Sequence, residues 1–204
     1  MKLQGWIQQF KTMKHYIIAS AFVFLFGVVL GYTDSSAFDK LIHAQLEQMR
    51  VISEGINQSD HFHWALFLRI ILNNLLASAM VILFGFFFGL VPLYFLVSNG
   101  LLLGYVAANR SEGETIFHLL AGILPHGIIE IPALILACAV GLRIGFLMLE
   151  SFGSLFNLER REQYQIRLRS FIKHLIPMLA LIAGLMLLAA IIESTVTYAL
   201  LKII

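Results

Sequence analysis

Long apolar runs, separated by short stretches that hold most of the charge, constrain this chain more than any other feature. The runs cover residues 16–32, 62–108, 115–152 and 174–204. Only 13% of the residues are charged and 59% are hydrophobic, whereas a soluble domain carries about 25% charged residues. A water-soluble fold would lack the polar surface to cover so much apolar material, while a bilayer accepts it. The sequence therefore predicts an all-α, polytopic membrane helix bundle.

The lengths of the runs predict how many times the chain crosses the membrane. A helix rises 1.5 Å per residue, so a hydrocarbon core of roughly 30 Å takes about 20 residues. The second run is long enough for two crossings, with a reversal near Gly89–Pro92. We predict one integral membrane domain over residues 1–204 with five transmembrane helices, at about 16–32, 65–89, 91–108, 126–149 and 175–200.

The run from 115 to 152 fits neither one crossing nor two. As one helix it would be roughly 55 Å long, too long for one span and too short for two spans and a turn. We predict a re-entrant helix at about 116–124 and then a helix break at Pro125, Gly127 and Pro132. Non-helical backbone at membrane depth survives only against protein or a wet cavity, so the break should face the bundle interior.

The distribution of lysine and arginine predicts the orientation. Lysines without acids precede the first run, acids outnumber bases between 34 and 63, and arginines concentrate between 153 and 173. By the positive-inside rule the N-terminus is cytoplasmic, and 153–173 forms a cytoplasmic basic loop. Arg143 is long enough to snorkel toward the same edge. The predicted localisation is multi-pass, in the cell membrane.

The outer segment carries a helical pattern of its own. Residues 36–39 match a capping box, and apolar residues then recur at helical spacing, namely Phe38, Leu41, Ile42, Leu46, Met49 and Ile52. This predicts an outer amphipathic helix at about 37–54. Such a helix either lies on the outer leaflet or caps the bundle. The alternative is a docking face for an extracytoplasmic partner.

Four pairs of glycines stand four residues apart: Gly27 and Gly31, Gly85 and Gly89, Gly100 and Gly104, Gly141 and Gly145. Small residues at this spacing let helix backbones approach closely in lipid. They predict tight packing either within the chain or between copies in a homo-oligomer. The single cysteine, Cys138, cannot form an intrachain disulfide.

Polar residues inside the apolar runs are the candidate functional residues, because burying a polar group without a partner is costly. We predict an intramembrane polar cluster of Asn73, Asn74, Asn99, His126, Glu130 and Glu193. His126 and Glu130 are one helical turn apart and would share a face.

Three roles are open for His126 and Glu130. They could be structural, holding the helix break open; they could handle a proton or a substrate; or they could bind a metal together with His118. The His-Glu-x-x-His motif of zinc hydrolases is absent.

No nucleophile elbow or phosphate-binding glycine loop occurs, so no cofactor is predicted. A net charge of +2 without a basic, aromatic-rich stretch argues against nucleic acid.

The motifs resemble those of the stage II sporulation protein M family over nearly the whole chain. The resemblance rests on Asn73-Asn74, Asn99-Gly100, Leu103-Gly104, Leu124-Pro125-His126-Gly127, Glu130, Pro132-Ala133 and Gly141. It implies a bacterial cell-membrane protein of about five spans. The named member acts in engulfment during sporulation, as a scaffold for peptidoglycan-degrading partners, and the family supplies no agreed catalytic residue.

The predicted function is accordingly a non-enzymatic membrane scaffold in the lipid bilayer, with an extracytoplasmic cell-wall hydrolase complex as the expected partner. The alternative is a small transporter or an intramembrane metal-dependent enzyme that uses His126 and Glu130.

Overall fold

The computed structural model describes residues 2–34, 38–56, 62–109, 116–154, 158–192 and 194–195, and this part of the chain is helical apart from short turns. The helices are α1 (Lys2–Thr33), α2 (Asp39–Ile56), α3 (Phe62–Leu83), the short 3-10 helix η2 (Phe84–Phe86), α4 (Leu90–Ala108), α5 (Ile116–Ser154) and α6 (Leu158–Ile192).

Five of the six α-helices are long and apolar enough to cross a membrane, which confirms the predicted all-α membrane bundle. The apolar spans are Lys11–Thr33, Phe67–Phe86, Leu90–Ala108, Gly127–Ser154 and Glu159–Ile192. Many large apolar side chains on their outer faces are exposed, among them Phe22, Leu72 and Ile176. Those faces are suited to lipid.

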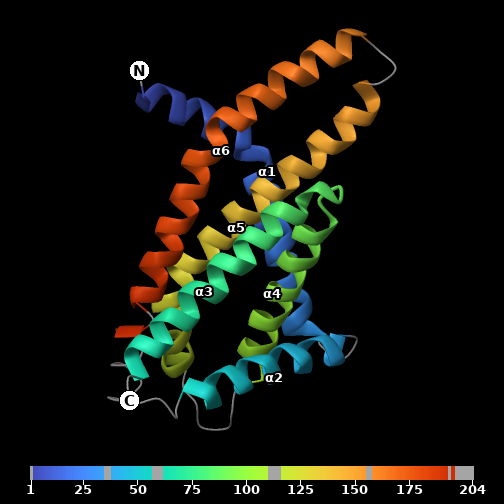
Figure 1. Cartoon of the computed structure of the whole chain (residues 1–204). Helices are drawn as coiled ribbons and strands as arrows, with labels where there is room; N and C mark the ends of the chain where they lie inside the picture. Colours follow the sequence, from blue (N-terminus) through green and yellow to red (C-terminus); the bar gives the residue numbers. More distant parts are fainter. Residues whose placement is uncertain are drawn as a thin grey trace.

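The spans alternate in direction, so the bundle has two distinct ends (Figure 1). The N-terminus, the turn between α3 and α4 and the gap between α5 and α6 lie toward one end, which we call the N-terminal end. At the opposite end α4 stops, α5 begins and α2 lies across the bundle. We call this the α2 end.

Glycines bring α1 and α4 into backbone contact. A Cβ atom added at Gly27 would lie 2.7 Å from the carbonyl oxygen of Val97, and one added at Gly100 would lie 3.0 Å from the Cα of Gly27. Gly31 and Gly104 continue the same contact one turn further on, against Leu101 and Val28. The two predicted glycine pairs on these helices therefore pack against each other.

The other two glycine pairs join the α3–α4 turn to α5. A Cβ at Gly85 would lie 2.7 Å from the Cα of Gly141, and one at Gly145 would lie 2.7 Å from the Cα of Gly89. Gly89 also closes the turn, since its φ of 78° is in the left-handed region that glycine accepts readily. All four glycine pairs are thus used inside the chain, and they give no argument for self-association.

The structure does not show the predicted re-entrant helix at 116–124. Residues Ile116–Ser154 form one continuous α-helix through Pro125, Gly127 and Pro132, where the sequence predicted a break. Prolines are tolerated in membrane helices when neighbouring groups satisfy the freed backbone.

With 39 residues, α5 is longer than one membrane crossing requires. Its C-terminal part extends past the α3–α4 turn (Figure 1). Gly141 packs on the α3–α4 turn, so the part from Ile116 to Gly141, about 37 Å, lies between the α2 end and that turn. The remaining residues, to Ser154, project about 20 Å past that turn.

The predicted basic loop at 153–173 is likewise helical from Leu158 onward. Less exposed residues of α6 recur at helical spacing, at Tyr164, Leu168, Phe171, Leu175 and Met178. This stripe belongs to the same apolar cluster as residues of α5. The projecting parts, residues 146–154 of α5 and 158–171 of α6, form an antiparallel pair that we call the α5–α6 hairpin (Figure 1).

Candidate functional site

Glu130 lies on the buried stripe of α5. Gly127, Ala133, Leu134 and Ala137, which are three, four or seven residues away from it on the helix, are all buried. Residues at these spacings share one face of a helix. Glu130 is itself half-buried, so its carboxyl group lies on the side of α5 that faces the bundle.

Asn74 lies at the same depth on α3. The helices α3 and α5 run in the same direction and pack together. Asn74 and Glu130 each stand eleven residues before the glycines that meet, Gly85 and Gly141. Both are therefore about 16 Å from that contact.

Asn74 also faces inward. It is buried, and so are Ile71, Ser78 and Val81 on the same side of α3. Ile71 belongs to an apolar cluster with Ala133 and Ala137 of α5. By contrast, its neighbour Asn73 is exposed, so the structure does not bring Asn73 into the predicted polar cluster.

Asn99 is half-buried on α4 and is satisfied within its own helix. Its Nδ2 donates a hydrogen bond to the carbonyl oxygen of Phe95, at 2.8 Å. Asn99 follows Pro92, which packs on Gly141, by seven residues. It is therefore about 10 Å from that contact, one helical turn nearer the N-terminal end than Glu130.

The remaining predicted site residues lie outside the part that the structure describes. This holds for the side chains of His118 and His126 and for Glu193. The metal alternative, which needs both histidines, is therefore untested. Among the described residues, no three His, Cys, Asp or Glu side chains come together as a metal site.

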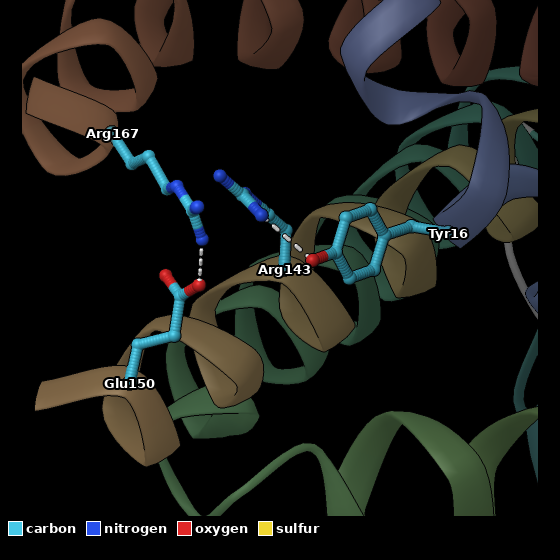
Figure 2. Close-up of polar contacts among 4 residues, drawn as sticks. All are labelled: Tyr16, Arg143, Glu150 and Arg167. Carbon is cyan, nitrogen blue, oxygen red and sulfur yellow. Dashed lines mark hydrogen bonds and ion pairs between the residues drawn. The ribbon is translucent and has the colours of Figure 1, made fainter. Parts of the chain in front are cut away.

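A second polar group, which sequence reasoning did not predict as a unit, lies at the N-terminal end (Figure 2). Arg143 of α5 donates a hydrogen bond from Nη1 to the Tyr16 hydroxyl of α1, at 2.7 Å. Its guanidinium carbon lies 5.2 Å from the centre of the same ring, and Phe146 meets that ring edge to face. Arg143 thus joins the first span to the fourth.

Two helical turns beyond Arg143, Glu150 of α5 forms an ion pair with Arg167 of α6 (Figure 2). The Glu150 side chain is 16% exposed and that of Arg167 is 50% exposed. This pair ties the two helices of the hairpin together. It lines an open cavity of about 390 Å³, whose other walls are Leu149, Gly153, Arg160, Gln163 and Tyr164.

Part of this second polar group could have been predicted from the sequence. Tyr16 begins the first apolar run, and tyrosine is enriched at membrane interfaces. Tyr164, Leu168 and Phe171 recur at helical spacing within the basic stretch, which indicates a packed helix rather than a loop. The ion pair itself could not be found without placing α5 beside α6.

These features define a polytopic α-helical membrane protein with a tight, glycine-packed interior. Residues 20–198 match the sequence profile of the family described as Stage II sporulation protein M. The chain belongs to that family.

One relative is an uncharacterized protein of Methanocaldococcus jannaschii, 32% identical over 149 residues. The match covers 71% of this chain and 60% of the relative, so the chain spans about three fifths of that protein's length. No solved structure matches the chain.

Proposed function

We propose that this chain is a non-enzymatic membrane scaffold, and that α2 is the element on which its partners dock. The observation that carries the proposal is how α2 is held. Ile42 is fully buried, and Leu41 and Leu46 are half-buried. The ring of His43 lies 6.3 Å from that of Tyr105 on α4. The helix is therefore packed against the bundle by one face.

The other face of α2 is polar and open. Asp39, Lys40 and Glu47 are exposed, and the Asp39 carboxylate lies 3.1 Å from Nε2 of His43, which stands at the edge of the packed face. A mixed-charge surface on a firmly packed helix suits recognition of another protein, because little ordering entropy remains to be lost on binding.

The proposed orientation places α2 outside the cell. Lys11 and Lys14 of α1 and the arginines of the hairpin lie toward the N-terminal end, opposite α2. The positive-inside rule then puts the N-terminal end in the cytoplasm. The family resemblance supplies the class of partner, namely proteins that remodel peptidoglycan, in a bacterial cell membrane.

Site-specific photo-crosslinking in living cells tests this proposal. A photoreactive amino acid replaces Ala44 or Glu47, both exposed on α2, and in a matched control it replaces Leu72, which is exposed on the lipid face of α3. We expect discrete protein adducts from the α2 positions only, and a cell-wall hydrolase or its binding protein among them. Adducts with lipid alone from Ala44 and Glu47 would overturn docking on α2.

A second candidate function rests on Glu130. An acidic residue on the buried stripe of a membrane helix, level with Asn74, is a site where a proton or a cation could bind. We therefore retain as the alternative a small transporter or an intramembrane metal-dependent enzyme that uses Glu130 and His126.

The change Glu130→Gln separates these alternatives. If the variant stays monodisperse but loses its function in cells, Glu130 handles a proton or a substrate. If the purified wild-type protein holds one zinc ion per chain and the variant holds none, the metal version is supported. A variant that is active in cells, beside a wild-type protein with substoichiometric zinc, excludes both.

A further inference from the structure

The cavity in the α5–α6 hairpin has the chemistry of a phosphate site. Arg160 and Arg167 line it, against a single carboxylate from Glu150. Gln163 and Tyr164 add neutral groups that can donate hydrogen bonds. Two guanidinium groups and one carboxylate give the cavity a net positive charge. The planar guanidinium of an arginine can donate two parallel N–H hydrogen bonds to two oxygens of one phosphate.

Arg160 reaches back toward α5. A Cβ atom at Gly153 would lie 4.0 Å from Nη1 of Arg160, so the Arg160 guanidinium lies next to this part of α5. The ion pair with Glu150 fixes where Arg167 points. Arg167 is thus positioned from α5 although it belongs to α6.

The cavity lies near the level of the lipid headgroups. The α3–α4 turn is uncharged and exposes Phe86, Phe87 and Phe88, which suits an apolar or interfacial environment. Gly145 packs on that turn, and Leu149 and Gly153 lie about 6 to 12 Å further along α5. The headgroup zone of one leaflet is about 5 to 8 Å thick, so the mouth of the cavity is at or just outside it.

Apolar side chains flank the same cavity. Leu149 lines it and is 52% exposed, and Phe152, beside Gly153, is 57% exposed and packs its ring 5.9 Å from that of Phe88. A phosphate compound with acyl chains could therefore place its headgroup on the arginines and its chains along Leu149 and Phe152.

We propose that this cavity binds the phosphodiester headgroup of one anionic phospholipid from the leaflet at the N-terminal end. In this site Arg160 and Arg167 donate hydrogen bonds to the phosphate oxygens. Glu150 orients Arg167 and lowers the net charge of the cavity. The site would hold the hairpin against the membrane surface at a defined point.

Native mass spectrometry of the full chain, delipidated in detergent and titrated with phosphatidylglycerol or phosphatidylcholine, tests the proposal. We expect one phosphatidylglycerol per chain, held about tenfold or more tightly than phosphatidylcholine. The change Arg160→Gln should weaken phosphatidylglycerol binding about tenfold, as expected for losing a charge-assisted hydrogen bond.

Arg161→Gln is the matched control, because Arg161 is the exposed neighbour that does not line the cavity. It removes the same charge and should leave the affinity within about twofold of wild type. Equal losses in Arg160→Gln and Arg161→Gln would show diffuse attraction to the basic helix and would overturn the site. If Arg160→Gln does not fold, Arg167→Gln serves instead, and it should weaken phosphatidylglycerol binding about tenfold for the same reason.

Glycerol phosphate distinguishes the source of the phosphate. Without acyl chains it should displace phosphatidylglycerol only weakly, because it cannot contact Leu149 and Phe152 as the lipid does. Complete displacement at equal concentration would assign the cavity to a soluble phosphate compound and would overturn the lipid assignment.

Discussion

The glycine contact between α1 and α4 predicts a sharp response to a single methyl group. In Gly27→Ala the new Cβ would lie 2.7 Å from the carbonyl oxygen of Val97 and 3.2 Å from the Cα of Gly100. Ordinary van der Waals contact begins at 3.4 Å, so the helices must separate by about 0.7 Å at this point. The obstacles are backbone atoms, which cannot rotate away as a side chain would.

The energetic cost follows from this separation. A gap of about 0.5 to 1 Å forfeits about a quarter to a half of the dispersion energy of the contacts that it opens. Overpacking a well-packed core costs about 1 to 3 kcal/mol. Alanine recovers about 0.5 to 1 kcal/mol because glycine is the weaker helix former. The difference spans about 0 to 2.5 kcal/mol, and we therefore expect Gly27→Ala to lower the free energy of unfolding by about 1 kcal/mol.

Gly184→Ala is the control. Gly184 lies within α6, and a Cβ atom there would meet nothing within 4 Å. The same substitution should be neutral, or stabilising by up to about 1 kcal/mol. Reversible unfolding of both variants in bicelles, followed by circular dichroism, gives the comparison. If Gly27→Ala is as stable as Gly184→Ala, the backbones of α1 and α4 lie further apart than the 2.7 Å distance at Gly27 requires.

Three further substitutions probe the polar groups, and the same unfolding measurement reads them out. Tyr16→Phe removes the acceptor for Arg143 and should cost about 1 to 2 kcal/mol, because hydrogen bonds to charged groups exceed neutral ones; no loss would mean that this bond adds nothing to stability. Glu150→Gln should lower the free energy of unfolding by at most about 1 kcal/mol, since Arg167 is half-exposed. A larger loss of stability that persists in 1 M salt would contradict an ion pair that solvent and salt screen. Ser78→Ala should be neutral or stabilising by up to about 1 kcal/mol, because the buried Ser78 Oγ has no hydrogen-bond partner in the described structure; a clear loss of stability would indicate one.

The spans were predictable because hydropathy depends on composition along the chain and needs no knowledge of neighbours. Phe67–Phe86 and Leu90–Ala108 each match the length of one crossing. The glycine spacings predicted close packing, yet they could not say which helices meet. That Gly27 lies against Val97 and Gly100 depends on how the helices are arranged in space.

The error at α5 came from treating membrane thickness as an upper limit on helix length. Helical structure need not stop at the membrane boundary, and here α5 and α6 support each other past the α3–α4 turn through Tyr164, Leu168 and Phe171. The Arg143–Tyr16 bond joins residues 127 positions apart. No pattern of neighbouring residues in the sequence indicates a contact between residues so far apart. This second polar group could therefore be identified only from the structure.

The two glycine interfaces together hold α4 on both sides. Along its length Gly100 and Gly104 lie against α1, and at its start Pro92 lies against Gly141 of α5. Moving α4 would break both interfaces, because the first brings backbone atoms of α1 and α4 together and the second packs the rigid ring of Pro92 on Gly141. A transporter needs two arrangements of its helices, whereas a scaffold needs one that keeps its docking elements in fixed positions. The packing of α4 therefore favours the scaffold proposal, with α2 at one end of the bundle and the α5–α6 hairpin at the other.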